Sequence, residues 1–253
     1  MTVRLHHRVT GAPGRPTVVV GGSLGSTLAS WGPAIAALSG DFHVIAYDHR
    51  GHGGSPAPAG PYSIEDLALD VVGLLDEQQV DRAHVIGLSL GGMVAQQIAA
   101  QQPHRVDRLV LLCTSAHADR QPWTERAAAV RAGGTGAIAD AALGRWLTSG
   151  YRLAHPEVAA GLREMLASID DEGYAACCEA IANMDLRPGL SRIQAPTLVI
   201  AGAEDPSMPP EQMRAMAAAI AGSRFEVVPG AHVPPLEHPD AVTRLLLEHL
   251  AGA

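Results

Sequence analysis

The stretch His84-Val85-Ile86-Gly87-Leu88-Ser89-Leu90-Gly91-Gly92-Met93 decides how the rest of the sequence is interpreted. The apolar residues before Gly87 predict a buried strand, and residues 93–98 predict a helix. Between them lies the pattern Gly-x-Ser-x-Gly. A serine on such a sharp strand-to-helix turn has strained backbone angles, and flanking glycines let strand and helix approach closely. The alternative is an ordinary glycine-rich turn, but in this context the pattern predicts a nucleophilic Ser89.

A serine nucleophile needs a base, and the base needs an acid that orients it. In this kind of fold both follow the serine, the acid first, on loops after later strands. Asp205 follows the apolar run Thr197–Ala201, and His232 follows Phe225–Val228. We therefore predict the order Ser89, Asp205, His232.

Two neighbours compete for these roles. Glu204 is the rival acid, because a shift of one residue in the loop would exchange it with Asp205. His238 is the rival base, but it lies further along the chain, where the final helix begins.

An oxyanion hole needs two backbone N–H groups. The first is expected from Leu90, directly after the nucleophile. The second is expected from the loop Gly21–Ser26, where we assign Ser23 and keep Leu24 as the alternative. Phosphate binding by this loop is disfavoured, since it has neither Gly-x-Gly-x-x-Gly spacing nor a following lysine.

Short β-branched runs alternate with helical patterns along most of the chain, which is typical of a parallel sheet with crossover helices. Ser63 and Asp66, for example, predict the capped start of a helix. From about His117 to Asp185 only helical patterns occur. We predict an α/β core formed by residues 1–116 and 186–253, with helices on both faces of the sheet and residues 117–185 inserted as a helical lid.

Composition narrows the function. Among 253 residues, 47% are hydrophobic and 17% charged, mean hydropathy is +0.10, and all 18 basic residues are arginine. The absence of lysine excludes P-loop, Schiff-base and Ser-x-x-Lys chemistry. A net charge of −8 without a basic cluster argues against nucleic acid and anionic membranes as partners. We expect a small-molecule substrate and no cofactor, and the sequence leaves the oligomeric state open.

The chain has no run of apolar residues long enough for a membrane span, and its first residues lack the apolar core of a signal peptide. These features predict a cytoplasmic protein. Three cysteines, two of them adjacent at Cys177 and Cys178, cannot form a disulfide framework, and the adjacent pair is expected to pack in the interior rather than act in redox chemistry.

Asp48, His49 and His52 lie close together in sequence and resemble metal ligands. No Cys/His pairs or His-Glu-x-x-His pattern accompany them, so we predict no metal site. A structural turn with Arg50 in a buried ion pair is the expected alternative.

The core resembles the α/β-hydrolase superfamily through the turn at Ser89, the segment Asp48–Gly53, Asp205 and His232. More narrowly, the chain resembles the 3-oxoadipate enol-lactonases of the β-ketoadipate pathway of aromatic catabolism. Ser23-Leu24-Gly25, residues 87–93 and Arg145-Trp146-Leu147-Thr148 carry this resemblance. The lid stretch Gly173-Tyr174-Ala175-Ala176-Cys177-Cys178 is its most specific part. The resemblance covers nearly the whole chain.

Some positions depart from the family pattern, among them Gly21-Gly22, His49, Leu147 and the loop Val233–Leu236. They leave the three predicted catalytic residues unchanged and bear on substrate choice. The resemblance implies hydrolysis of a small enol-lactone through an acyl-enzyme. The alternatives are hydrolysis or perhydrolysis of neutral esters and, in a different class, ligand binding without hydrolysis.

The enol-lactone implied by the resemblance carries a carboxylate, and without lysine only arginine or neutral donors can hold it. Arg126 and Arg145, with the indole N–H of Trp123, are the candidates. Trp146 and Leu24 complete the predicted substrate-binding residues, although tryptophans in the lid are as readily explained by packing.

Overall fold

The computed structural model describes residues 2–252 and contains a seven-stranded sheet with the order β1-β3-β2-β4-β5-β6-β7. β1 runs antiparallel to β3, and the other neighbours are parallel. The strands are β1 (His7–Thr10), β2 (Thr17–Gly21), β3 (His43–Tyr47), β4 (Ala83–Leu88), β5 (Val106–Leu112), β6 (Thr197–Gly202) and β7 (Arg224–Val228). The central strands β4 and β6 are buried along their whole length, as a sheet covered on both faces requires.

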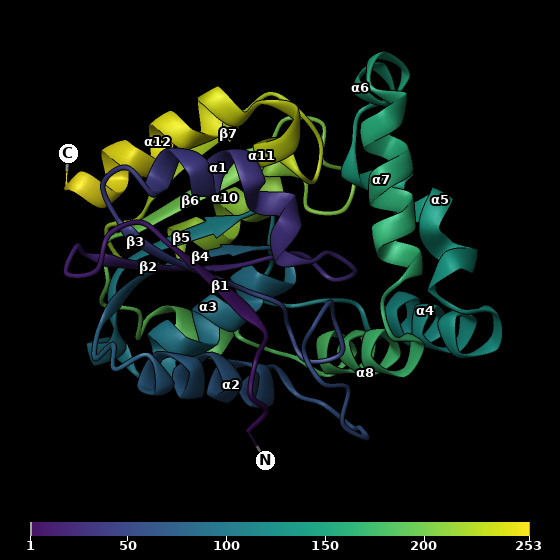
Figure 1. The fold of residues 1–253 in the computed structure, drawn as a ribbon, viewed down its shortest axis with the longest axis horizontal. Helices are drawn as coiled ribbons and strands as arrows, with labels where there is room; N and C mark the ends of the chain where they lie inside the picture. Colours follow the sequence, from purple (N-terminus) through teal and green to yellow (C-terminus); the bar gives the residue numbers. More distant parts are fainter. Residues whose placement is uncertain (1, 253) are drawn as a thin grey trace.

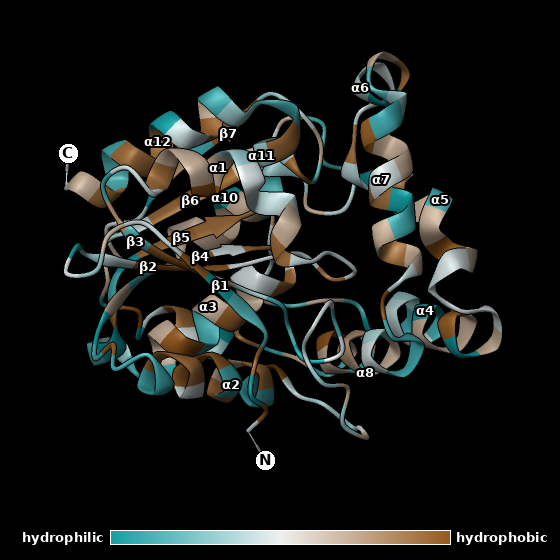
Figure 2. Ribbon diagram, viewed as in Figure 1, coloured by the Kyte–Doolittle hydropathy of each residue, from teal (hydrophilic) through white to brown (hydrophobic). Residues whose placement is uncertain are grey.

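Helices cover both faces of this sheet (Figure 1). One layer contains α1 (Gly32–Leu38), α11 (Pro234–Glu237) and α12 (Pro239–Ala251), and α10 (Pro210–Ala218) packs against β6 and β7. The other contains α2 (Ile64–Glu77), α3 (Leu90–Gln101) and the short α9 (Arg187–Leu190). The strands between the layers are predominantly apolar (Figure 2). Ser63 caps α2 by accepting a hydrogen bond from the Asp66 N–H, and the Asp66 carboxylate accepts one from the Ser63 N–H, as predicted.

Five further helices follow β5 and stand to one side of the sheet, over the carboxyl ends of its strands (Figure 1). They are α4 (Arg120–Gly133), α5 (Ala139–Trp146), α6 (Ser149–Ala154), α7 (Pro156–Ala167) and α8 (Asp171–Ala182). α4 and α8 pack against each other. His117 and Asp185, at the two ends of the segment predicted as a lid, form an isolated antiparallel bridge. The chain thus leaves and re-enters the sheet layer at adjacent points.

The predicted fold class is confirmed: a mostly parallel sheet lies between two helical layers. Four elements were not predicted. The edge strand β1 and the short helices α6 and α11 have no clear pattern in the sequence, and residues 28–31 form a 3-10 turn before α1. In the described part of the chain, no helix combines the length and apolar character that crossing a membrane requires.

The parallel strands end at a common edge, and their register determines which loops meet there. Gly21 at the end of β2 pairs with Gly87 in β4, and Gly202 at the end of β6 pairs with Val228 in β7. The loops that follow therefore emerge side by side. Ligands of open α/β sheets bind at this edge, so it is the first place to look for a functional site.

Candidate active site

Ser89 occupies a strained turn between β4 and α3. Its φ of 54° and ψ of −112° lie outside the regions that residues other than glycine normally adopt. The turn is closed tightly, because a Cβ atom on Gly87 would collide with the Gly91 carbonyl and one on Gly91 with the Gly21 carbonyl. Glycines are thus required at both positions, and they hold the serine hydroxyl at the end of the sheet.

The three side chains predicted to act together are in contact. His232 Nε2 lies 2.9 Å from Ser89 Oγ, and His232 Nδ1 lies 2.7 Å from Asp205 Oδ2. All three residues are at most 5% exposed. An imidazole that donates from Nδ1 to a carboxylate keeps Nε2 free to accept the serine proton. This is the arrangement of a serine activated by a histidine base.

Asp205 is held in turn by the chain around it. Its Oδ1 accepts hydrogen bonds from the N–H groups of Ser207 and Met208, at 2.8 and 3.1 Å, so Oδ2 is directed to the histidine. The rivals are placed elsewhere: Glu204 and His238 are exposed, and neither bonds to the other two side chains.

The N–H groups of Ser23 and Leu90 both lie at the carboxyl ends of adjacent strands. Neither donates a hydrogen bond to any acceptor within residues 2–252, although both residues are nearly fully buried. The Gly91 N–H donates to the Gly22 carbonyl at 2.9 Å, which fixes the loop after β2 against the start of α3. Two free donors beside a serine hydroxyl can bind a developing oxyanion.

Two histidines in the turn after β3 hold the loop after β2 by hydrogen bonds to its backbone. The Gly25 N–H donates to His52 Nε2 at 2.9 Å, His52 Nδ1 donates to the Arg50 carbonyl at 3.1 Å, and His49 Nε2 donates to the Gly22 carbonyl at 3.0 Å. Burial lowers the pKa of His49 to about 3 and that of His52 to about 4. Both rings are therefore neutral at pH 7, as the accepting Nε2 of His52 requires.

The same turn contains the predicted ion pair. Arg50 Nε lies 2.6 Å from Asp70 Oδ2, and both side chains are buried. Asp48 accepts hydrogen bonds from the Leu28 and Gly54 N–H groups, at 2.7 and 3.0 Å. Asp48, His49 and His52 thus bind the backbone of neighbouring loops, which is a structural role.

One further group lies beside the histidine and aspartate. Potential ligand atoms of Cys113, Asp205 and His232 lie within 4.8 Å of one another. The histidine and carboxylate are already bonded to each other, and burial, followed by the charge of Asp205, raises the pKa of the Cys113 thiol. A protonated thiol is a poor metal ligand, so this grouping is packing around the hydrogen-bonded pair.

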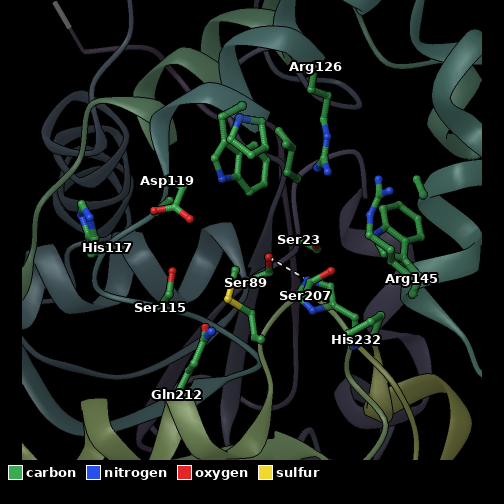
Figure 3. A pocket seen from close by; sticks show the side chains of 18 of the residues that line it. Ser23, Ser89, Ser115, His117, Asp119, Arg126, Arg145, Ser207, Gln212 and His232 are labelled. Atoms are coloured by element: carbon green, nitrogen blue, oxygen red, sulfur yellow. Dashed lines mark hydrogen bonds between the residues drawn. The ribbon is translucent and has the colours of Figure 1, made fainter.

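A cavity of about 580 Å³ opens above Ser89 and is walled by the helices that follow β5. All five residues predicted to bind substrate line it, and Figure 3 shows Arg126 and Arg145 on one side of the serine. These residues are Leu24, Trp123, Arg126, Arg145 and Trp146. Their side chains can therefore reach a ligand bound at Ser89; that they do so remains a prediction.

The two arginines give one wall of the cavity a positive charge. The Arg126 guanidinium lies 4.4 Å from the centre of the Trp123 ring, and neither arginine forms a salt bridge within residues 2–252. Burial, followed by repulsion from Arg126, lowers the pKa of Arg145. Two unneutralised guanidinium groups in one cavity favour an anionic ligand.

The opposite wall was not anticipated from the sequence. Ser115, His117 and Asp119 line it, after the end of β5, as Figure 3 shows. Ser207 and Gln212 add polar groups from the segment after β6. The rule that binding loops follow parallel strands could have indicated these residues, because each lies soon after a strand end.

The comparisons with known proteins agree with this arrangement. A family model described as the alpha/beta hydrolase fold matches residues 15–239. The chain is 40% identical to 3-oxoadipate enol-lactonase 2 of Acinetobacter baylyi over 240 residues, which are 94% of this chain and 90% of the relative.

Two solved structures are similar over almost the whole chain. The enol-lactonase from Burkholderia xenovorans superposes with a TM-score of 0.97 at 42% identity, covering 98% of this chain and 97% of that one. A thermophilic esterase from Thermogutta terrifontis superposes with a TM-score of 0.92 at 33% identity, covering 98% and 93%. The resemblance inferred from Ser89, Asp205 and His232 is thereby confirmed, and this chain belongs to the alpha/beta hydrolase fold family.

Proposed function

We propose that this protein hydrolyses the ring ester of 3-oxoadipate enol-lactone, giving 3-oxoadipate through an acyl-serine intermediate. The observation that carries the proposal is a nucleophile–base–acid chain, Ser89–His232–Asp205, that opens into a cavity with two arginines that form no salt bridge within residues 2–252. Similarity to enol-lactonases over more than nine-tenths of the chain supports the choice of substrate.

The first step is attack on the lactone carbonyl. Ser89 Oγ forms a bond to the carbonyl carbon while His232 Nε2 takes its proton, and Asp205 stabilises the imidazolium. The N–H groups of Ser23 and Leu90 bind the oxyanion. Loss of one such donor costs about 10² to 10³ in rate in known enzymes, so these two groups are central to the proposal.

The second step is ring opening. The bond between the carbonyl carbon and the ring oxygen breaks, His232 returns its proton to that oxygen, and the oxygen leaves as an enol. The enol then becomes a ketone, which draws the reaction forward. A water molecule that loses a proton to His232 next attacks the acyl-serine; the bond from the acyl carbon to Ser89 Oγ breaks, His232 returns the proton to Oγ, and the acid is released.

The side of the cavity that contains Arg126 and Arg145, called the arginine wall below, can bind the free carboxylate that the substrate keeps. Arg126 and Arg145 would receive that carboxylate, with the Trp123 indole N–H as a neutral donor. Partly buried guanidinium groups bind carboxylates with hydrogen bonds that are stronger than those between neutral groups. The helical segment 117–185 would act as the lid that supplies this wall and excludes water.

A neutral ester is the second candidate substrate. The similarity to the Thermogutta terrifontis esterase favours it, and the same three residues would perform the same steps. The two candidates differ in their need for a positive wall, since a short neutral ester has no carboxylate to place there.

The test compares two substrates and one variant. The decay of the enol-lactone's ultraviolet absorbance is followed with the purified protein and with Ser89→Ala, beside hydrolysis of p-nitrophenyl acetate. Lactone turnover that exceeds ester turnover and disappears in Ser89→Ala supports the proposal. Ester turnover without lactone turnover overturns the substrate, and activity that survives in Ser89→Ala overturns the mechanism.

The proposal also includes the predicted cytoplasmic location. Three free, buried cysteines are compatible with a reducing compartment. Fractionation of cells that express the tagged protein tests this part separately.

A further inference from the structure

Glu237, the last residue of α11, is a buried carboxylate that the proposed reaction does not use. It is 7% exposed, and within residues 2–252 it forms no salt bridge. A buried carboxylate without a cation is costly unless several donors satisfy it. Three donors do so here, and they come from two different parts of the chain.

One carboxylate oxygen binds the loop that carries the histidine. Glu237 Oε2 accepts a hydrogen bond of 2.6 Å from the N–H of Ala231, the residue directly before His232. The other oxygen binds the helical segment above the cavity. Glu237 Oε1 accepts hydrogen bonds from the N–H and the hydroxyl of Thr148, at 2.9 and 2.7 Å.

Two more hydrogen bonds join the same segments. The Val233 N–H donates to the Trp146 carbonyl at 3.0 Å, and the Tyr151 hydroxyl donates to the Leu236 carbonyl at 3.1 Å. Trp146 lines the cavity and Arg145 precedes it. The loop of the histidine and the arginine wall are therefore bonded directly to each other.

Among the residues that join these two segments, Glu237 is the hardest to substitute without loss of a hydrogen bond. Its contacts include two backbone N–H groups, which can only donate, so a carboxylate with two accepting oxygens satisfies both ends. A glutamine in its place would turn an NH₂ group toward one of these N–H groups. One end of the link would then be lost whichever way the amide is turned.

We propose that Glu237 is a positioning residue that fixes His232 relative to the segment Arg145–Thr148 of the arginine wall, so that the base and the bound substrate stay aligned. The proposal rests on the proposed function for the identity of the wall's ligand. Alignment to within fractions of an ångström is what hydrogen-bonded supports give to catalytic groups, and a displacement of about 1 Å can cost about 10²-fold in rate.

The experiment measures kcat and KM of Glu237→Gln with the enol-lactone and with p-nitrophenyl acetate. The number of active sites is counted by complete labelling with a fluorophosphonate, and rates are expressed per labelled site. A smaller fraction of folded protein therefore does not lower the calculated kcat. We expect kcat to fall by about tenfold or more for both substrates. We expect KM to rise for the lactone only, because only the lactone uses the arginine wall. Unchanged kcat per labelled site overturns the proposal.

Thr148 provides milder variants, although its hydroxyl also caps α6 (Ser149–Ala154) by accepting a hydrogen bond from the Tyr151 N–H at 3.3 Å. Thr148→Val removes the hydroxyl but keeps the backbone N–H, and Thr148→Ser restores the hydroxyl. We expect Thr148→Val to lower kcat and Thr148→Ser to retain it. In the double variant with Glu237→Gln, Thr148→Val should add no further loss, and an additive loss overturns transmission through the carboxylate.

Tyr151→Phe is the matched control, since it removes one hydrogen bond between the same two segments without touching Glu237. If Tyr151→Phe lowers kcat as much as Glu237→Gln does, any hydrogen bond between the two segments has this effect, and the specific role proposed for Glu237 is overturned. If the wild-type protein does not turn over the lactone, the proposed substrate fails while the ester kcat values still test Glu237.

Discussion

The backbone of Gly51, in the turn after β3, lies directly against the backbone of Gly173 in the first turn of α8. A Cβ atom on Gly51 would lie 2.5 Å from the Gly173 Cα, and one on Gly173 would collide with Gly51 in the same way. The turn that supports the oxyanion loop and the helix that bears Tyr174 in the cavity wall meet without any intervening side chain.

Gly173→Ala should therefore move α8 away from the turn. We expect a lower Tm and a KM for the enol-lactone that rises several-fold, because the cavity wall shifts while Ser89, His232 and Asp205 are untouched. Thermal unfolding and steady-state kinetics check this. Gly161→Ala is the control: its Cβ would meet nothing within 4 Å, so alanine should stabilise α7 by up to about 1 kcal/mol.

The acid of the triad can be tested against its neighbour in sequence. Asp205→Asn keeps the size of the side chain but loses the charge that selects the histidine tautomer, and kcat should fall by about 10³ to 10⁴. Glu204→Gln, at an exposed position, should leave kcat within a factor of two or so of the wild type. The reverse order of these effects would make Glu204 the acid.

The arginine wall predicts a selective loss of substrate binding. Arg145→Gln and Arg126→Gln should each raise KM for the lactone by about tenfold to hundredfold, as expected for loss of a hydrogen bond to a charged group. Hydrolysis of p-nitrophenyl acetate should change little. Arg163→Gln removes an exposed arginine that pairs with Asp140 and serves as the control. Equal losses on both substrates would contradict the assignment of these arginines to the carboxylate.

The lowered pKa of His52 predicts how the free energy of unfolding depends on pH. Burial lowers its folded-state pKa to about 4, below the ordinary value of 6.5. The unfolded chain therefore binds a proton first as the pH falls, so stability present above about pH 6.5 is lost between there and about pH 4. For this group the loss is at most about 3 kcal/mol.

Urea unfolding at pH 7, 6, 5 and 4.5 measures this dependence. His52→Gln, whose side-chain oxygen can still accept from the Gly25 N–H, should reduce the slope of the curve between pH 6.5 and 4 and leave the part that His49 contributes. His104→Gln, at an exposed position, should leave its shape unchanged. A curve that keeps its slope in His52→Gln would show that His52 is not the titrating group.

The sequence predicted the parts of the site that depend on local pattern. Ser89 was predicted because glycines and a strand-to-helix change surround it, and Asp205 and His232 because each follows a strand in a known order; the structure brings these three side chains into contact. Glu237 was missed, since its partner Thr148 lies 89 residues away and nothing near it marks it as buried. The edge strand β1 was missed because only four residues form it and none is fully buried.

The strained turn at Ser89 also affects how such a chain changes over generations. A non-glycine residue at a φ of 54° carries a conformational cost of order 1–3 kcal/mol, which glycine would remove. Ser89→Gly should therefore raise the Tm relative to both the wild type and Ser89→Ala while abolishing hydrolysis. A lineage released from selection for catalysis would gain stability from that single substitution, so we expect descendants that have lost activity to carry glycine at the nucleophile position ahead of changes at Asp205 or His232.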